Sequence, residues 1–229
     1  MSAHRSVALA RLLQLASPAL PVGAYSYSQG LEAAVAAGIV HDASSAAEWI
    51  GDMLDLSVAR LEAPVLLRLH EAWRGADFEA VARWNELFLA SREAAELRAE
   101  TAQMGFSLRR LVLELGLGDA ARRGALAMPE EVGFPTPFAF ASAAWCIEPQ
   151  EALIAYLWAW VENQAMAAMK AVPVGQTDAQ RLLALLGERL PDVAEDAAAW
   201  RDDELGNVTP GLGLLSSRHE TQYSRLFRS

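Results

Sequence analysis

Apolar residues recur along the chain at the spacing of helices that bury one face. Between Leu108 and Leu115 they follow the i, i+3, i+4, i+7 pattern of one buried stripe. No run of alternating apolar and polar residues bounded by turns indicates a strand. The pattern predicts helices near 6–16, 26–37, 46–62, 65–74, 78–90, 92–115, 119–126, 137–147, 150–170, 178–188, 192–203 and 217–226. The fold class that these elements predict is all-α.

Capping residues and prolines place several helix boundaries. Ser45 and Glu48 have the spacing of a capping box, and Thr177 with Gln180 repeats it. Pro64 falls inside a long helical pattern, where a proline removes a backbone hydrogen bond and breaks or kinks the helix. We therefore expect one helix to end before this proline and another to begin after it.

The segment 150–170 is apolar on nearly every face and carries Trp158 and Trp160. A helix of that kind belongs in the centre of a bundle or in a large interface. Its most apolar part, Ala152–Val161, is shorter than the roughly 18–20 residues that a membrane span needs. No internal repeat or long linker divides the chain. The sequence predicts a single domain over 1–229, built as a multi-helix bundle around this apolar helix.

Composition narrows the choice of partners and compartment. The chain has 19 Lys and Arg against 29 Asp and Glu, a formal charge of −10, which disfavours binding to nucleic acid or an anionic membrane. Cys146 is the only cysteine, so no intramolecular disulfide can form, as is usual in a reducing compartment. Arg11 and Gln14 interrupt the apolar N-terminal stretch, which does not read as a secretory signal. We expect a cytoplasmic protein.

The sequence lacks the motifs of common catalytic sites. Lys170 is the only lysine and no glycine-rich loop precedes it, which excludes a nucleotide-binding P-loop. GxSxG, HExxH and CxxC motifs are also absent, and the four histidines are scattered. We therefore predict no catalytic residues, no metal site and no enzymatic activity of its own. An interaction protein fits the apolar and aromatic composition better.

The segment 216–229, SSRHETQYSRLFRS, which we call the tail, is unusual because chain ends are commonly polar and frayed. Ser217 and Glu220 have capping-box spacing, which predicts a helix over 217–226. That helix would carry a basic face and a separate aromatic face. Two docking sites are then open to it: the chain's own acidic surface, for example near Asp202–Glu204, or a partner protein.

Three stretches, in this order and spacing, carry a family resemblance. They are LLQLASPALPVGAYSYSQGLE at 12–32, KAVPVGQ at 170–176 and the tail itself. Together they resemble the UreF family of urease accessory proteins over essentially the whole chain. The stretch between Arg74 and Gly133 carries no recognised signature, so no residue role is transferred there.

The resemblance implies an all-α protein that forms a homodimer and binds the accessory protein UreD, also called UreH. That complex recruits the GTPase UreG and delivers nickel into apo-urease, completing its dinickel centre. Nickel is then expected in transit and no cofactor is expected to be bound tightly. An alternative role within the same assembly is a GTPase-activating or gating regulator of UreG.

The resemblance also implies roles for individual residues. Glu32 and Lys170 stand at motif positions suited to gating or GTPase coupling. The alternative for Glu32 is an ordinary carboxylate on a helix surface. The alternative for Lys170 is a cation that complements the C-terminus of its helix. Removing the tail is expected to abolish partner binding and to leave helicity and melting nearly intact. The residues expected to bind partners are Arg218, His219, Glu220, Tyr223, Arg225, Leu226 and Phe227.

Overall fold

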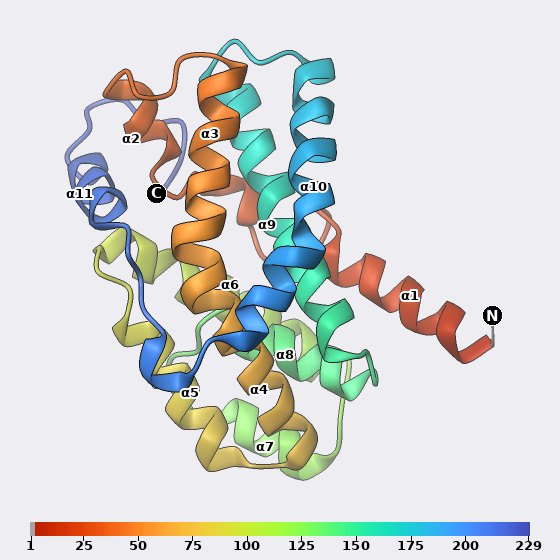
Figure 1. Ribbon diagram of the computed structural model, residues 1–229. Helices are drawn as coiled ribbons and strands as arrows, with labels where there is room; N and C mark the ends of the chain where they lie inside the picture. The colour runs from red at the N-terminus through yellow and green to blue at the C-terminus, as the bar shows by residue number, and fades with distance from the viewer. Residues whose placement is uncertain (1–2) are drawn as a thin grey trace.

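The computed structural model describes residues 3–229 and shows helices packed around one long central helix (Figure 1). These residues contain no strand, so the predicted all-α fold is confirmed. A π-helical segment, Leu54–Glu62, joins two of the helices, and 3₁₀ turns occupy Ala24–Ser26 and Asp202–Glu204. The α-helices are α1 (Ala3–Ala16), α2 (Leu31–Ala36), α3 (Ala43–Met53), α4 (Ala63–Gly75), α5 (Phe78–Ala90), α6 (Ala95–Glu114), α7 (Ala120–Ala127), α8 (Pro135–Ala144), α9 (Pro149–Ala171), α10 (Gln176–Ala199) and α11 (Pro210–His219).

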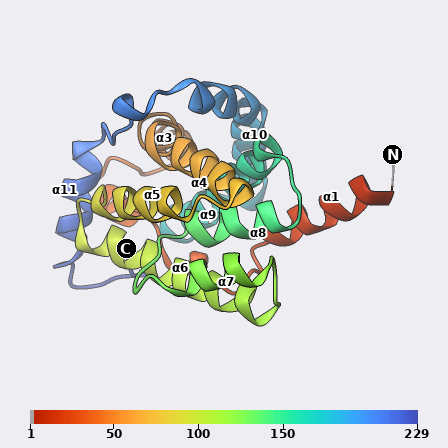
Figure 2. The ribbon, with the colours of Figure 1, turned by 90° about the horizontal axis from the view of Figure 1, so that it is seen from below.

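The apolar helix α9 lies at the centre of the bundle, as the sequence predicted. It packs against α1, α2, α3, α4, α8 and α10, and Leu153, Leu157 and Val161 on it are fully buried. Figure 2 shows α3 and α4 on one side of α9 and α6 on the other. In both views α1 projects from the rest of the bundle. The projection leaves apolar side chains of α1 exposed, among them Leu9 and Leu13.

Pro64 does not break the helix in which it lies. The chain is helical without interruption from Ala43 to Gly75, and the segment before Pro64 is π-helical. Because proline has no N–H, the carbonyl of Arg60, four residues earlier, cannot receive its usual bond. The N–H of Gly206 lies 3.4 Å from that carbonyl and supplies a substitute. The expected break at Pro64 is therefore wrong: Gly206, in the segment between α10 and α11, donates to the carbonyl that the proline leaves free.

The helices expected over 178–188 and 192–203 are one helix, α10, with Pro191 in its interior. Leu186, Leu190 and Val193 continue a single buried stripe across the proline. Burial of that stripe outweighs the roughly 3 kcal/mol that an interior proline costs.

The helix expected over 217–226 is also wrong. Helix α11 begins at Pro210 and ends at His219, with Leu212, Leu215, Ser216 and His219 buried on one stripe. Proline suits a first helical turn, so the helix starts earlier than capping-box spacing suggested. From Glu220 onward the tail runs in turns without helix.

A capping box does form at the start of α3, with different members from those expected. The side chain of Asp42 accepts the N–H of Ser45, and the hydroxyl of Ser45 accepts the N–H of Asp42. Ser45 is therefore the third helical residue rather than the cap.

Replacement by alanine should change the stability of the fold in opposite directions at two helical glycines. At Gly105, in α6, an added methyl group would overlap the backbone carbonyl of Val132, whereas Gly124, in α7, has open space around it. Replacing Gly105 by alanine should destabilise the fold by about 1–3 kcal/mol, because the backbone at Val132 must shift. Replacing Gly124 by alanine should stabilise it by about 0.5–1 kcal/mol. Urea unfolding measures both, and a Gly105→Ala protein as stable as the wild type would contradict the close contact.

Candidate functional site

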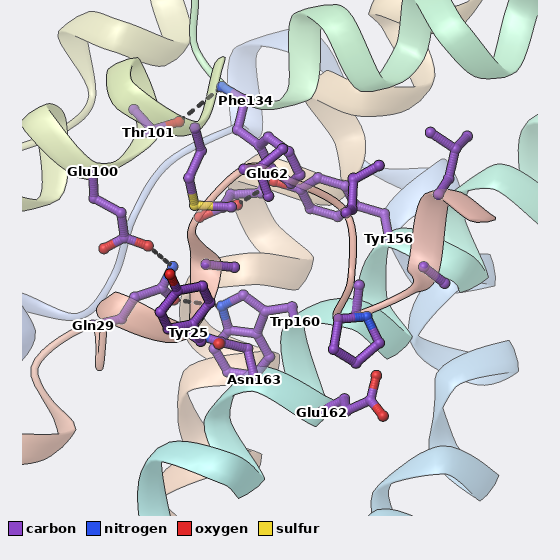
Figure 3. Close-up of a pocket in the computed structure, with 18 of the residues that line it drawn as sticks. Tyr25, Gln29, Glu62, Glu100, Thr101, Phe134, Tyr156, Trp160, Glu162 and Asn163 are labelled. Carbon is purple, nitrogen blue, oxygen red and sulfur yellow. Dashed lines mark hydrogen bonds between the residues drawn. The ribbon is translucent and has the colours of Figure 1, made fainter. Parts of the chain in front are cut away.

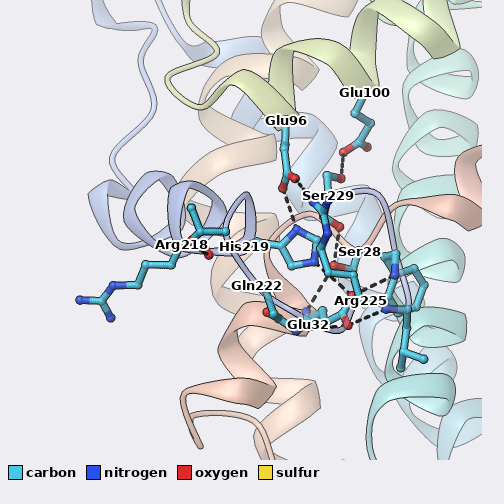
Figure 4. Close-up of polar contacts among 12 residues, drawn as sticks. Ser28, Glu32, Glu96, Glu100, Arg218, His219, Gln222, Arg225 and Ser229 are labelled. Carbon is cyan, nitrogen blue, oxygen red and sulfur yellow. Dashed lines mark hydrogen bonds and ion pairs between the residues drawn. The ribbon is translucent and has the colours of Figure 1, made fainter.

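The tail folds back onto the segment of the chain that contains α2 (Figure 4). His219, at the end of α11, is fully buried between two carboxylates. Its Nε2 is 3.1 Å from Oε2 of Glu32 in α2, and its Nδ1 is 2.7 Å from Oε2 of Glu96 in α6. We call Glu32 and Glu96 the glutamate clamp. Residues far apart in the sequence thus meet at one imidazole.

Glu32 also holds the backbone of the tail. Its Oε1 accepts the N–H of Leu226 at 2.7 Å, and its Oε2 accepts the N–H of Phe227 at 2.9 Å. The amide of Gln222 lies 3.4 Å from Oε1. Hydrogen bonds to an ionised carboxylate are stronger than bonds between neutral groups. Because Glu32 is only 6% exposed, its interpretation as an ordinary surface carboxylate is wrong.

Glu96, the second residue of the glutamate clamp, and the last residues of the tail also hold the tail in place. Arg225 donates from Nη1 to Oε1 of Glu96 at 2.6 Å. The backbone N–H and the hydroxyl of Ser28 both donate to the backbone oxygen of Ser229, at 2.8 and 2.6 Å. The N–H of Arg228 donates to the carbonyl of Ser26 at 2.8 Å. The tail therefore pairs with 26–32 through main-chain as well as side-chain groups.

Lys170 touches the same docked tail from the end of α9. Its Nζ lies 5.3 Å from the centre of the Phe227 ring and 5.9 Å from that of Tyr25. A cation over an aromatic face is attracted to the ring's electrons. The same Nζ is 3.4 Å from the carbonyl oxygen of Tyr25. The structure therefore brings Glu32 and Lys170, the two predicted coupling residues, to the same residue of the docked tail, Phe227.

The predicted partner-binding residues divide into two groups. His219, Phe227 and the paired Arg225 face the chain's own body. The other four residues present exposed side chains, and Figure 4 shows Arg218 pointing away from the clamp. The acidic body site is Glu96 and Glu32 rather than the expected Asp202–Glu204. The exposed members are Arg218, Glu220, Tyr223 and Leu226.

A cavity of about 90 Å³, lined mainly by apolar side chains with a few polar ones, lies beside the docked tail, between α6, α9 and the chain around Pro18–Tyr25 (Figure 3). At its buried end Glu62 accepts the hydroxyl of Tyr156 at 2.8 Å and pairs with Nη1 of Arg92 at 2.9 Å. Burial, followed by the charge of Glu62, raises the pKa of Tyr156 well above its usual value. Tyr156 therefore stays neutral and serves as a donor to Glu62.

Glu100 joins this cavity to the tail. Its Oε1 accepts the side-chain amide of Gln29 at 2.5 Å, and its Oε2 accepts the hydroxyl of Ser229 at 2.8 Å. Burial raises the pKa of Glu100 from an ordinary value near 4.5 to about 7, and the charge of Glu62 adds to the rise. Glu100 is therefore only partly ionised near neutral pH, and it contacts the last residue of the tail directly.

Sequence motifs did not identify four residues of these two sites. Glu62, Arg92, Glu96 and Glu100 carry no motif, and three of them fall in the stretch without a recognised signature. One signal was present: Glu96 and Glu100 are four residues apart near the start of α6, so both lie on one helix face. Their burial depends on contacts with distant segments and could not be deduced from that spacing alone.

Two other histidines, His41 and His70, lie outside these sites. His70 is buried, and burial lowers its pKa, while its Nε2 lies 3.0 Å from the carbonyl of Ile147. His41 is exposed. Within residues 3–229 no group of three or more His, Cys, Asp or Glu side chains is placed to hold a metal ion. In the same residues, none of the helices has the length and apolar character needed to cross a membrane.

Comparisons with known proteins cover nearly the whole chain. The family model described as UreF matches residues 40–187. A urease accessory protein UreF of Azoarcus sp. is 58% identical over 226 residues, covering 96% of this chain and 95% of that protein. One of Dechloromonas aromatica is 53% identical, covering 96% and 97%. One of Methylobacillus flagellatus is 51% identical over 229 residues, covering all of both chains. The relatives therefore extend the match to Glu32 and the tail, which lie outside the family model.

Proposed function

Because this chain belongs to the UreF family of urease accessory proteins, we propose that it is the chaperone subunit of a cytoplasmic nickel-insertion complex. With UreD (UreH) and the GTPase UreG, it assembles the dinickel centre of apo-urease. GTP hydrolysis belongs to the partner, since this chain has no P-loop. Nickel passes through the assembly without tight binding to this subunit, which has no catalytic role of its own.

The observation that carries this proposal is the docked tail. Buried His219 and Phe227 anchor it on either side of a turn that leaves Tyr223 and Leu226 exposed, at 105% and 67% of their reference area. An exposed aromatic on a preformed segment loses little conformational entropy on binding. The tail thus offers a partner an ordered edge rather than a loose end. We assign UreD to this edge first and UreG to the completed complex.

The exposed tail side chains should contribute to partner binding and little to folding. We expect a Tyr223→Ala, Leu226→Ala double variant to melt like the wild type, because neither side chain is buried. Its affinity for UreD should fall by about 2 kcal/mol or more, the usual effect of losing an interface hot spot. Pull-down with UreD, followed by addition of UreG, measures the loss. Leu185→Ala, an equally exposed leucine on α10, serves as the control, and unchanged capture by the double variant would exclude the tail as the docking element.

Deleting the whole tail would change folding as well as partner binding, contrary to the expectation from the sequence. Residues 216–229 include buried Ser216, His219 and Phe227, so their removal exposes the glutamate clamp. Helicity and melting would change together with partner binding. Point substitutions at exposed positions separate the two effects.

A gating or activating role toward UreG is favoured by one feature. Arg218 is exposed on the tail and has no ion pair within residues 3–229. An arginine supplied to a partner's nucleotide site can raise GTP hydrolysis by about 10³–10⁵. Single-turnover hydrolysis by UreG in the complete assembly, with wild-type chain and with Arg218→Ala, tests this role. Equal rates with and without this subunit would reject activation.

We also propose that the chain forms a homodimer through α1. This helix projects from the bundle and exposes Val7, Leu9 and Leu13 at 49%, 48% and 63%. Exposed apolar side chains gathered on one projecting helix are typical of an interaction surface. A second copy of the same helix would bury Leu9 and Leu13 symmetrically, because these two side chains are four residues apart and share one face. Sedimentation velocity of the isolated chain measures this association.

A further inference from the structure

Glu100 is a buried carboxyl group that the last residue of the docked tail contacts (Figure 4). Glu100 is 3% exposed, and Ser229, whose hydroxyl donates to its Oε2 at 2.8 Å, is 1% exposed. Glu32 and Glu96 both lie within ion-pair distance of His219, whereas Glu100 has no ion pair with any described residue. An ionised carboxylate without a cation beside it depends on water, which the docked tail keeps away. Docking of the tail therefore disfavours the ionised form of Glu100.

The side chain of Gln29 determines which oxygen of Glu100 carries a proton (Figure 3). The indole Nε1–H of Trp160 can only donate, so the atom of Gln29 that it contacts is the amide oxygen. The amide nitrogen of Gln29 therefore donates to Oε1 of Glu100, and this oxygen serves as an acceptor. A proton on Glu100 consequently resides on Oε2, the oxygen that faces the hydroxyl of Ser229.

Burial decides which protonation state of Glu100 the docked tail favours. Burial raises the pKa of Glu100 to about 7, against the opposing effect of the hydrogen bonds from Gln29 and Ser229, and the charge of Glu62 adds to the rise. When the tail moves away, water reaches the carboxyl group and its pKa returns toward its ordinary value near 4.5. The docked state therefore binds the proton more tightly than the open state, and opening becomes easier as the pH rises from about 4.5 to about 7.

We propose that the tail and Glu100 form a proton-sensitive switch, in which the tail stays docked while this carboxyl group is neutral and opens more often once it is ionised. The hydrogen bonds of Gln29 carry the change from Glu100 to Trp160 in α9, at the wall of the cavity. The switch lies within the chain itself, so its test needs only the isolated full-length protein and no partner.

Other charged groups near Glu100 differ in their effect on the tail. Glu62 and Arg92 form an ion pair with each other, so their charges partly cancel at Glu100. His219 is different, because histidine commonly changes its charge near neutral pH and loss of a proton would weaken its attraction to the glutamate clamp. The experiment must therefore separate Glu100 from His219. The groups that interact electrostatically with Glu100 are Tyr27 before α2, Glu62 in the π-helical segment, Arg92 before α6 and Tyr156 in α9.

Amide hydrogen exchange of the isolated full-length protein at pH 5 and pH 8 tests the switch. After correction for the intrinsic effect of pH on exchange, the equilibrium constant for opening at Leu226 and Phe227 should rise by about tenfold or more between these values. These amides should exchange faster than those of α9 at both pH values, because the tail opens while the helices stay packed. Tail amides that show no such rise, or that exchange only as slowly as the amides of α9, would overturn the proposal.

Glu100→Gln separates the contribution of Glu100 from that of His219. The glutamine is neutral at both pH values, so most of the rise at Leu226 and Phe227 should disappear and the tail should stay docked at pH 8. Glu114→Gln, at an exposed position on the same helix, is the matched control and should keep the wild-type rise. A full rise in Glu100→Gln would assign the pH response to His219 and contradict the proposal.

The indole Nε1–H signal of Trp160 reports the same titration from the side of the cavity. In the wild type this NMR signal should shift with a midpoint near pH 7, where Glu100 ionises, and the shift should be lost in Glu100→Gln. Trp158, also on α9, packs against Gly187 of α10 and serves as the control signal that stays unchanged. Replacing each tryptophan by phenylalanine assigns the two signals. A constant Trp160 signal, or an equal shift in Glu100→Gln, would contradict the transmission through Gln29 that the proposal requires.

Discussion

Replacing Glu32 by glutamine should detach the tail from the body of the protein. The wild-type carboxylate receives the N–H groups of Leu226 and Phe227 and lies 3.1 Å from the ring of His219. Glutamine keeps one acceptor oxygen and turns the other into a donor, which then faces a group that itself donates. Breaking one side of a buried, charge-assisted cluster typically costs about 3–5 kcal/mol.

Glu32→Gln should loosen the tail first and affect the rest of the fold less. The tail from Glu220 onward runs in turns outside the helices and can separate while the helices stay packed, so its own docking energy limits the loss. Amide hydrogen exchange at Leu226 and Phe227 should accelerate by about a hundredfold or more, while the amides of α9 keep their protection. Exchange followed by mass spectrometry or NMR measures both regions in one experiment.

Glu114→Gln is the matched control for this substitution. Glu114 lies on α6 with an exposed side chain and pairs with exposed Arg110. Its replacement should leave tail exchange unchanged, because exposed ion pairs contribute little. If Glu32→Gln leaves Leu226 and Phe227 as protected as in the wild type, the clamp does not hold the tail. Under the proposed function, a detached tail also weakens capture of UreD, since the ordered edge is lost.

The helical architecture could be predicted because it depends on local periodicity. The stripe through Leu108 and the apolar character of 150–170 are properties of neighbouring residues. The buried helix over 150–170 is confirmed, and the stripe is buried at Leu108 and Val112 but not at Leu115, which follows the end of α6 and is 51% exposed. The merging of two expected helices across Pro191 could not be predicted in the same way. It depends on the buried surface that α9 and α4 offer to α10, which only the folded chain defines.

The tail shows most clearly which features of the structure sequence motifs do not predict. Its spacing predicted a helix over 217–226, whereas the helix in the structure begins at Pro210, buries Leu212 and Leu215, and ends at His219. The resemblance drew attention to Glu32 and Lys170, but it did not show that both contact the tail. The roles of Glu96 and Glu100 depend on contacts with residues far away in the sequence, chiefly His219 and Ser229.

Glu100 should make the protein less stable as the pH rises toward neutrality. Its pKa is near 4.5 in an unfolded chain and about 7 in the folded protein, mainly because the carboxyl group is buried. The folded state therefore binds more protons between these values, and stability falls as the pH increases through that window. Below about pH 4.5 the penalty is absent, and above pH 7 it is complete. The shift corresponds to about 3 kcal/mol.

Glu100→Gln should remove this penalty and stabilise the protein at alkaline pH. A neutral amide can still accept from Gln29 and can donate to the hydroxyl of Ser229, so the contacts at both ends survive. Urea unfolding at pH 5 and pH 8 should show a gain of about 3 kcal/mol at pH 8 and a much smaller gain at pH 5. Glu188→Gln, at an exposed position on α10, should change little at either pH. An equal gain at both pH values would mean that Glu100 is not the titrating group, because its burial would then cost the same in either protonation state.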